Sequence, residues 1–164
     1  FEDFLQIDAP INRGNSGGAL VALNGELIGI NSQILSPSGG NIGIGFSIPS
    51  NMAKSVMEQL LKDGKVKRGR LGVGIQTITE EFAKTLGLKE NKGVLVNSVS
   101  PGSAAEKAGI KRGDVITAIN GERIEDGNAL RNKVAATAPG TEISLTVLRD
   151  GKEQEFKATL DEFQ

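Results

Sequence analysis

Short hydrophobic runs alternate with turn residues over the first 48 positions of the chain. Each run has the length of a β-strand, and the runs lie at 4–7, 19–21, 27–30 and 44–48. Asn24-Gly25, between the second and third runs, is typical of a two-residue hairpin turn. Ser36 to Gly40 has the composition of a loop. The pattern predicts half of a β-barrel in this part of the chain.

A helix is expected to follow these strands. It opens at Pro49-Ser50-Asn51 and ends near Asp63. Hydrophobic residues recur along it at every fourth position: Met52, Val56 and Leu60. Ser50 is the expected N-cap, and Gly64 is placed to adopt the left-handed conformation of a C-cap. This helix ends the first hydrophobic pattern.

After residue 70 a second pattern alternates strands with two helices. Strand-like segments lie at 72–78, 93–99, 115–119, 142–149 and 152–160. Asn120-Gly121 and Asp150-Gly151 predict tight hairpin turns. Ala104 to Ala108 predicts a short helical turn, and Asp126 to Thr137 predicts the main helix, with Asp126 as its N-cap. The chain is therefore expected to be mainly β, with two short helices in its second half.

Residues 64–70 separate the two patterns and read Gly-Lys-Val-Lys-Arg-Gly-Arg. We interpret this polar, cationic stretch as a solvated linker rather than a binding segment, apart from its last residues, which abut the next motif. Length alone allows one domain or two small ones in 164 residues, and the change of pattern favours two. The expected division is a first domain at 1–63, a linker at 64–70 and a second domain at 71–164.

Composition narrows the classes of function. The 19 basic and 20 acidic residues are mixed along the chain and leave a net charge of −1, which gives no reason to expect a nucleic-acid or acidic-membrane partner. No cysteine or histidine is present, so we expect no disulfide and no structural zinc. No other metal and no cofactor is expected. No apolar run reaches the roughly 18 residues of a membrane-spanning helix. The 22 glycines, without Trp or Tyr, fit a β-rich protein with many tight turns.

Residues 12–20, Asn-Arg-Gly-Asn-Ser-Gly-Gly-Ala-Leu, place Ser16 among glycines. Glycine weakens a helix or a strand by roughly 0.5–1 kcal/mol, so this composition indicates a requirement of the backbone itself. In acyl transfer a serine oxygen projects from a tight turn while backbone amides converge on the developing oxyanion. The amides of Gly14 and Ser16 are placed to do this. A glycine-rich turn between two strands is the alternative interpretation.

A serine nucleophile needs a general base whose pKa lies near neutrality. The chain has no histidine to serve Ser16. Lysine is the base in some serine hydrolases, but no lysine precedes Lys54 and no spacing points to one. The 164 residues are therefore expected to have no peptidase activity on their own.

Gly14-Asn15-Ser16-Gly17-Gly18 resembles the nucleophile loop of trypsin-like serine proteases. Further similarity to the HtrA (Deg) family extends over Ile11–Leu20, Asn24–Asn31 and Gly40–Ser50. In trypsin-like enzymes the histidine and the aspartate precede the serine, so the resemblance implies the C-terminal part of a larger protease, beginning inside its second barrel. No residue is assigned as the acid of the catalytic triad, because Asp3 and Asp8 lie too close to the first residue.

The same resemblance assigns roles near Ser16. Asn15 stands where many trypsin-like enzymes have an aspartate, and a neutral side chain cannot pair with a freed N-terminus, so activation by loop ordering is expected. Ile34 and Leu35 correspond to a wall of the pocket for the side chain before the cut. They would favour Val or Ala over Lys or Arg, because a buried cation would have no counter-charge there. The alternative is that both are ordinary strand residues.

The second half of the chain resembles the circularly permuted PDZ domain of bacterial HtrA proteins. The similar segments are Arg70–Val73, Val99–Ala105, Gly109–Ile116 and Ile119–Gly121. A PDZ domain adds an extended peptide as a strand and captures its C-terminal carboxylate with backbone amides, here those of Leu71, Gly72 and Val73. Glycine at 72 would leave room for the carboxylate, and Arg68 and Arg70 would add positive potential.

Hydrophobic residues on a helix and a strand are expected to form the walls of the peptide pocket. They are Leu130 and Val134 on the main helix, and Val73 and Ile75 on the strand. The alternative for each of them is an ordinary core position.

The resemblance implies an ATP-independent serine endopeptidase that degrades unfolded or misfolded proteins in quality control and the stress response. Its PDZ domain would bind C-terminal peptides. The resemblance also implies a bacterial periplasmic location and homo-oligomers built from trimers. The alternative is a non-enzymatic PDZ adaptor or chaperone with a degenerate protease remnant, an interpretation that the missing histidine supports.

Overall fold

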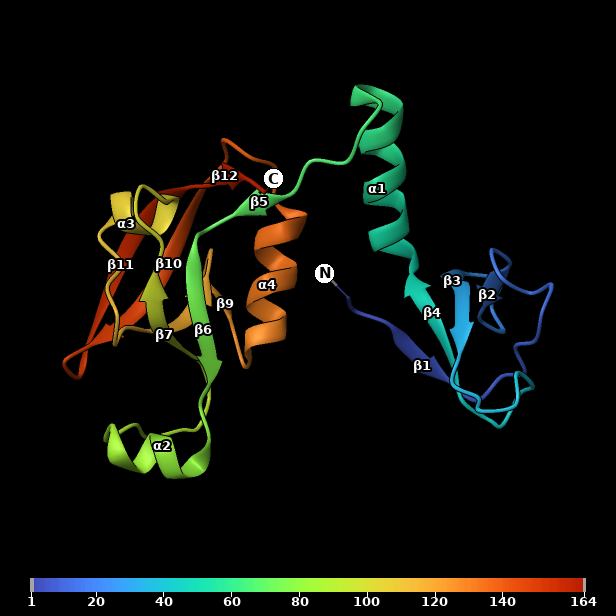
Figure 1. The fold of residues 1–164 in the computed structure, drawn as a ribbon, viewed down its shortest axis with the longest axis horizontal. Helices are drawn as coiled ribbons and strands as arrows, with labels where there is room; N and C mark the ends of the chain where they lie inside the picture. Colours follow the sequence, from blue (N-terminus) through green and yellow to red (C-terminus); the bar gives the residue numbers. More distant parts are fainter. Residues whose placement is uncertain (1, 164) are drawn as a thin grey trace. The chain divides into compact units, whose positions relative to one another are not determined.

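The computed structural model describes residues 2–163, which form two compact units (Figure 1). The first unit is Glu2–Val66, and the second begins at Lys67. Strands outnumber helices in both units. The expected mainly β fold class is therefore confirmed.

Four antiparallel strands form the sheet of the first unit, in the order β1-β4-β3-β2. Their bounds are β1 Leu5–Ile7, β2 Ala19–Val21, β3 Leu27–Ile34 and β4 Gly45–Pro49. All four predicted strands are confirmed, and β3 runs beyond its predicted end because its last residues also pair with β4. Asn24-Gly25 forms the expected turn: Gly25 has a φ of 86°, and its amide donates to the Ala22 carbonyl oxygen at 2.9 Å.

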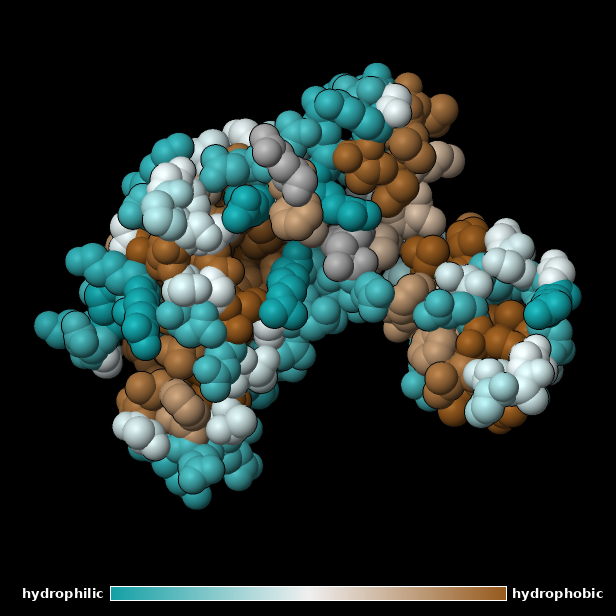
Figure 2. Space-filling model, viewed as in Figure 1, coloured by the Kyte–Doolittle hydropathy of each residue, from teal (hydrophilic) through white to brown (hydrophobic). Residues whose placement is uncertain are grey.

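Helix α1 spans Ser50–Asp63. Its predicted C-cap is confirmed, because Gly64 has a φ of 69° and its amide donates to the Leu60 carbonyl oxygen at 3.0 Å. The predicted N-cap is wrong: Pro49 occupies that position, and Ser50 is already helical. Figure 2 shows a hydrophilic and a hydrophobic side of α1, and none of its residues is fully buried.

The first unit buries little of its hydrophobic surface. Ile11, at 4% exposure, is the one buried hydrophobic residue among the described residues of this unit. Large hydrophobic side chains stay exposed at Val21, Leu23, Leu27, Ile28, Leu35, Ile42, Met57, Leu60 and Leu61. Exposed hydrophobic surface of this extent is typical of a face that packs against another structure.

A six-stranded sheet forms the second unit, in the order β11-β10-β8-β7-β6, with β9 also paired to β8. A separate two-stranded sheet pairs β12 with β5. The bounds are β5 Gly69–Arg70, β6 Val73–Thr77, β7 Val94–Val99, β8 Val115–Ile119, β9 Glu122–Arg123, β10 Glu142–Arg149, β11 Lys152–Thr159 and β12 Asp161–Glu162. The five predicted strands of this half are confirmed. The three strands of two residues were not predicted, because two residues are too few to show an alternation.

Three helices accompany these sheets within the described residues: α2 Glu80–Thr85, α3 Ala104–Ala108 and α4 Gly127–Ala136. The two predicted helices are α3 and α4, and Asp126 caps α4 as expected by accepting the Ala129 amide at 2.8 Å. We expected two helices in this half of the chain, and this number is wrong because α2 is a third. Its signal was present in the sequence: Thr79 caps the first turn, which carries Glu80 and Glu81.

The main core of the second unit joins α3 and α4 to one face of the six-stranded sheet. Its largest fully buried side chains include Ile116, Leu130, Ile143, Leu145 and Val147. Burying one side chain of this size contributes roughly 1.5–3 kcal/mol. Alternate residues of β10 point to the opposite face, where α2 covers a smaller hydrophobic cluster. The small cluster at α2 therefore lies on the other face of the sheet from the main core.

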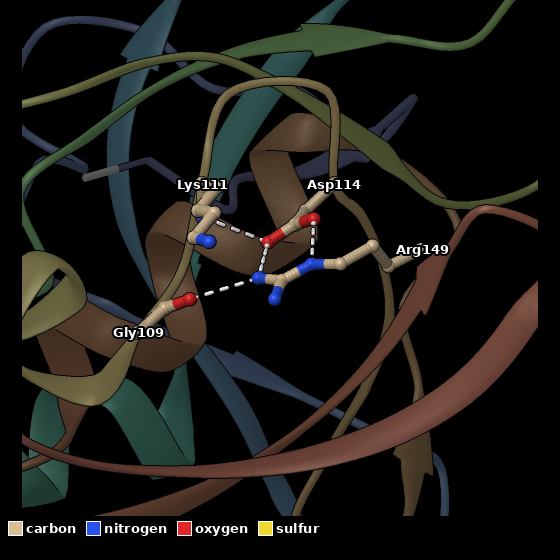
Figure 3. A network of polar contacts seen from close by, with 4 residues as sticks. All are labelled: Gly109, Lys111, Asp114 and Arg149. Carbon is tan, nitrogen blue, oxygen red and sulfur yellow. Dashed lines mark hydrogen bonds and ion pairs between the residues drawn. The ribbon is translucent and has the colours of Figure 1, made fainter.

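A buried ion pair ties the loop after α3 to the end of β10 (Figure 3). Asp114 is 1% exposed, and Arg149 donates Nε to Oδ1 at 2.8 Å and Nη2 to Oδ2 at 2.7 Å. Arg149 also donates to the Gly109 carbonyl oxygen at 2.8 Å, and the Lys111 amide donates to Asp114 at 2.8 Å. The guanidinium lies 4.8 Å from the centre of the Phe156 ring. This network fixes the C-terminal end of α3 against the sheet.

The charge of Asp114 is stabilised in this setting. Burial raises the pKa of its carboxyl, but hydrogen bonds from Arg149 and from the Lys111 amide, with the attraction of the nearby cations, lower it further. The net result is a pKa below the ordinary value of 3.8. The pKa of Arg149 is correspondingly raised by its hydrogen bond to Asp114.

Candidate functional site

Ser16 lies on an exposed turn that leads into β2. Its hydroxyl donates to the Ser32 carbonyl oxygen at 3.2 Å. Gly14 and Gly17 hold left-handed conformations, with φ of 101° and 83°, which other residues rarely adopt. The Gly17 amide donates to the Asn31 carbonyl oxygen at 2.8 Å, so the turn is fastened to β3. The glycines on either side of Ser16 therefore serve backbone geometry, as the sequence indicated.

The amides of Gly14 and Ser16 have no hydrogen-bond partner within residues 2–163, whereas their neighbours at Asn15, Gly17 and Gly18 all donate to backbone carbonyls. Asn15 donates to the Asn12 carbonyl at 3.1 Å, and Gly18 donates to the Asn15 carbonyl at 3.0 Å. The turn thus closes on itself and leaves two amides able to receive an external oxygen. Free amide donors are one requirement of an oxyanion hole, and the other is that both point at the same oxygen.

Strand β3 is irregular where it meets Ser16. Asn31 pairs with Ser47, and Gln33 pairs with Phe46, so a β-bulge places Ser32 outside the regular register. Bulges often reorient groups next to active sites. Here the bulge presents the Ser32 carbonyl to the Ser16 hydroxyl.

Asparagine side chains hold the segments around this turn, and only one of them, Asn15, was singled out in the sequence. Asn15 donates Nδ2 to the Pro10 carbonyl at 3.4 Å. Asn41 connects the loop after β3 to the approach of the turn: Nδ2 donates to the Ile11 carbonyl at 3.2 Å, and its amide donates to Asn12 Oδ1 at 3.1 Å. No local pattern joins residues 29 or 30 positions apart, so sequence reasoning missed these contacts.

Ile34 and Leu35 lie at the end of β3 and just beyond it. Ile34 is half-buried and pairs with Gly45, whereas Leu35 is 57% exposed. Both follow Ser32, whose carbonyl contacts the Ser16 hydroxyl. The structure therefore brings the predicted pocket wall onto the strand that contacts the predicted nucleophile.

A second candidate site is a groove of about 620 Å³ between β6 and α4. Figure 1 shows α4 lying beside β6, and the two are in contact. All six predicted peptide-binding residues line the groove: Arg70, Leu71, Gly72, Val73, Leu130 and Val134. Strand β6 is the last strand of its sheet, so its outer edge can pair with an added strand.

In the loop at the end of this groove, the carbonyls of Leu71 and Gly72 accept hydrogen bonds from the segment 100–105. Leu71 accepts the Ala105 amide at 2.9 Å, and Gly72 accepts the Ser100 amide at 2.9 Å. The amides of Leu71 and Gly72 have no partner among the described residues. These two amides therefore have no acceptor within the described part of the chain, and they belong to the loop for which the sequence analysis expects carboxylate binding.

The packing of the loop on α3 also requires glycine at position 72. Its φ is 83°, and a Cβ atom at this position would lie 2.3 Å from Cβ of Ser103. The added atom would therefore collide with Ser103, at the start of α3. The glycine allows the loop to pack on α3, which in turn is held by the Asp114–Arg149 network.

The hydrophobic walls serve the core and the groove together. Leu71, Leu130 and Val134 are 2–8% exposed and belong to the main core, yet all three line the groove. Val73 and Ile75 are half-buried and also line it. The two interpretations offered by the sequence are thus compatible for these side chains.

Among the groove residues that the sequence analysis did not single out are Arg131 and Phe163. Arg131 follows Leu130 on α4, and its spacing of three from Val134 could have revealed it. Phe163 is 62% exposed and donates its amide to the Arg68 carbonyl at 2.8 Å, as part of the pairing of β12 with β5. No local signal predicts that pairing, because its strands lie far apart in the chain.

The comparisons with known proteins match both units. The PDZ domain family matches residues 69–160, and the trypsin family matches residues 2–57. One relative is the "probable periplasmic serine protease do/HhoA-like" of Haemophilus influenzae, with 53% identity. The match covers 98% of this chain and 34% of that protein. Another is the periplasmic pH-dependent serine endoprotease DegQ of Escherichia coli, with 51% identity over 98% of this chain and 35% of that protein. The chain thus spans about a third of the length of the curated relatives it matches.

Solved structures agree with these relatives. The HtrA-type protease AlgW with tripeptide has a TM-score of 0.82 and 46% identity, over all of this chain and 55% of that one. The serine endoprotease from Yersinia pestis has a TM-score of 0.63 and 38% identity, over 98% of this chain and 52% of that one. No helix within residues 2–163 has both the length and the apolar character that spanning a bilayer requires.

Proposed function

Since the chain belongs to the HtrA (Deg) family of trypsin-like serine proteases and includes a PDZ domain, we propose that it forms part of an ATP-independent serine endopeptidase of protein quality control. Its substrates are unfolded or misfolded proteins. The location is the bacterial periplasm, as in the names of the similar proteases from Haemophilus influenzae and Escherichia coli.

Ser16 is the nucleophile in this proposal. Its hydroxyl oxygen attacks the scissile carbonyl carbon, its proton passes to a general base, and the amides of Gly14 and Ser16 stabilise the tetrahedral oxyanion. The supporting observation is the turn itself, in which an exposed hydroxyl stands beside two amides that are unpaired within the described residues. The base and its acidic partner are assigned to another part of the protease, since these 164 residues contain no histidine.

Ile34 and Leu35 form a wall of the pocket for the substrate side chain before the cut. Their hydrophobic side chains favour small aliphatic residues, because a hydrophobic wall offers no counter-charge to a buried cation. Asn15 supports the turn through the Pro10 carbonyl rather than through a charge. Activation therefore proceeds by ordering of the loops around Ser16, and Asn41 is placed to transmit that order.

The second unit binds peptides by strand addition along β6. The amides of Leu71, Gly72 and Val73 receive the C-terminal carboxylate. Leu130 and Val134 receive the last side chain of the peptide, and Arg70 adds positive potential next to the loop.

The wider organisation is also part of the proposal. A protease part at 1–63 and a PDZ domain at 71–164 are joined by a connector at 64–70, whose last two residues form β5. The exposed hydrophobic surface of the first unit supports packing against further parts of the barrel and against other subunits. The resulting homo-oligomer is built from trimers.

The non-enzymatic alternative, a PDZ adaptor or chaperone, is disfavoured. The relatives that match 98% of the chain are named as serine proteases. The missing histidine, which supported the alternative, is equally expected of a segment that spans about a third of such a protease.

Degradation of an unfolded protein such as casein tests the proposal in the full-length protein that contains these residues. Wild type is expected to degrade casein without ATP, and Ser16→Ala is expected to abolish degradation. Ser55→Ala, on α1, is the matched control and is expected to keep the activity. Undiminished degradation by Ser16→Ala would contradict the proposal.

A further inference from the structure

The groove between β6 and α4 is positively charged. Three arginines, Arg68, Arg70 and Arg131, are among its lining residues, and no Asp or Glu is among the described residues that line it. Hydrophobic side chains and backbone make up most of the remaining wall. The charge on the groove thus has one sign only.

Arg70 and Arg131 are not neutralised by the protein. Both are exposed, and neither forms an ion pair or a side-chain hydrogen bond within residues 2–163. Five other cations of this unit form ion pairs, such as Arg123 with Glu90 at 2.7 Å. Asp161 stands opposite Arg70 across the β5–β12 pairing, but its carboxylate accepts the Ala104 amide at 2.8 Å. Two cations of the groove are therefore available to a ligand.

The direction of the groove follows from the glycines at its two ends. A Cβ atom on Gly69 would lie 2.6 Å from the Val134 carbonyl oxygen, so the carboxylate loop adjoins the C-terminal half of α4. A Cβ atom on Gly127 would lie 3.2 Å from the Ile75 side chain, so the start of α4 adjoins the far part of β6. A peptide whose C-terminus sits at the loop therefore extends along α4 toward Gly127.

Arg131 lies part of the way along this path. It precedes Val134 and Ala135 by three and four positions, which is about 5–6 Å along a helix. An extended peptide advances about 6.6 Å in two residues, and residues two apart point to the same side. Arg131 lies between Leu130 and Val134 on α4, so its Cα atom is level with the pocket of the last side chain. The peptide side chain two residues earlier also faces α4, nearer to Gly127. The long Arg131 side chain extends toward it, because helical side chains lean toward the N-terminal end of their helix.

From this geometry we infer that the groove selects acidic C-terminal peptides, in which an Asp or Glu stands two residues before a hydrophobic C-terminal residue. Arg131 is the residue that determines this preference, and Arg70 strengthens binding of the terminal carboxylate. The inference rests on the proposed peptide binding by the PDZ unit and names the class of peptide that this unit takes. An acidic peptide complements the unpaired guanidinium, whereas a lysine at the same position would be repelled by it.

Fluorescence anisotropy with the 164-residue chain tests the inference. Four labelled peptides are compared that end in the same hydrophobic residue. Three carry Glu, Gln or Lys two residues before the C-terminus, and the fourth is the Glu peptide with an amidated C-terminus. The Glu peptide is expected to bind about three-fold more tightly than the Gln peptide at ~0.05 M ionic strength, with the Lys peptide weakest. The ratio is expected to approach one at ~0.5 M.

Substitutions assign the effect to a residue. Arg131→Gln is expected to remove the difference between the Glu and Gln peptides while leaving the affinity for the Gln peptide unchanged. Arg70→Gln is expected to weaken all three carboxylate-ended peptides alike. Arg112→Gln makes the same change of charge outside the groove and is expected to keep the preference.

Equal affinity for the Glu and Gln peptides, with the amidated peptide bound weakly, would overturn the inference and leave the proposed peptide binding standing. A preference for Glu that survives in Arg131→Gln would also overturn it. Binding of the amidated peptide as tightly as the free acid would instead contradict the proposed carboxylate capture, and the inference with it.

Discussion

The hydroxyl of Ser16 donates a hydrogen bond to the carbonyl oxygen of Ser32 at 3.2 Å. A hydroxyl has one proton to donate, so this bond must break before a general base can take that proton. The bond also joins the turn to the strand that carries Ile34. The position of the proposed nucleophile and the position of the proposed pocket wall are therefore set by the same bulge in β3.

Replacement of Gly14 by alanine should disable the oxyanion site. The φ of 101° at Gly14 is one that alanine rarely adopts, so the turn would rearrange and move the Gly14 amide. Loss of one oxyanion donor lowers kcat by about 100–1000-fold in comparable enzymes. We expect a loss of this size for Gly14→Ala in the full-length protein, measured as kcat on a fluorogenic peptide.

Gly25→Ala is the control for backbone strain. Gly25 has a similar conformation, with a φ of 86°, and open space around its Cα, but it lies in the β2–β3 hairpin. It is expected to lose about 1 kcal/mol of stability and to keep its activity. A kcat for Gly14→Ala within a few-fold of that for Gly25→Ala would count against an oxyanion role.

The proposed pocket wall at Ile34 and Leu35 predicts which peptide bonds are cut. Peptides with Val or Ala before the scissile bond should have a kcat/KM at least about ten-fold higher than peptides with Lys, because a hydrophobic pocket leaves a cation unpaired. The measurement is cleavage of a peptide series that varies at this one position, in the full-length protein. Preferential cleavage after Lys would mean that another part of the site sets the specificity.

Gly72→Ala should weaken peptide binding. The new methyl group would meet Ser103 at 2.3 Å, and the loop would have to move away from α3. We expect the affinity for a C-terminal peptide to fall by about ten-fold or more, a loss of at least ~1.4 kcal/mol, measured by anisotropy. Gly102→Ala is the matched control, because Gly102 also has a positive φ, of 72°, but no atom lies within 4 Å of the added methyl. Equal peptide affinity in Gly72→Ala and Gly102→Ala would show that peptide binding does not depend on the packing of the Gly72 loop on α3.

The Asp114–Arg149 pair should make the stability of the second unit depend on acid. Since the folded pKa of Asp114 lies below the ordinary value of 3.8, the pair stabilises the fold above that value, and the contribution is lost as pH falls through the folded pKa. Asp114→Asn, which leaves Arg149 without its partner, should cost about 3 kcal/mol near neutral pH. The difference from wild type should shrink below pH ~3.8.

Urea unfolding followed by circular dichroism between pH ~3 and ~7 measures this difference. The exposed pair of Lys54 and Glu58, 3.9 Å apart, provides the control. Glu58→Gln should change the free energy of unfolding by no more than about 0.5 kcal/mol. A constant difference between wild type and Asp114→Asn across this range would show that Asp114 does not stabilise through its charge.

The sequence predicted those elements whose signals are local. Asn24-Gly25, Asp126 and Gly64 each specify their turn or cap through their own conformational preferences, and the structure has them where they were expected. Ser50 failed as an N-cap because the preceding Pro49, with its fixed φ, already occupies that position. Helix α2 was not predicted, although its N-cap, Thr79, and the acidic residues of its first turn are signals of a helix start.

The remainder of the two sites depends on contacts between distant segments. The pairing of β5 with β12 places Phe163 at the groove, and Asn41 reaches Ile11 and Asn12 across the loop after β3. Neither contact leaves a periodic pattern in the sequence. The role of Gly72 illustrates the same limit, since the side chain that forbids a larger residue there belongs to Ser103.

Labelling with a fluorophosphonate, followed by peptide mass spectrometry, tests the central role of Ser16 most directly. In the full-length protein the adduct is expected on Ser16 and on no other serine, and Ser16→Ala should abolish it. The 164-residue chain, which has no histidine to activate the hydroxyl, should remain unlabelled. An unlabelled Ser16 in a full-length protein that is actively degrading casein would contradict the account.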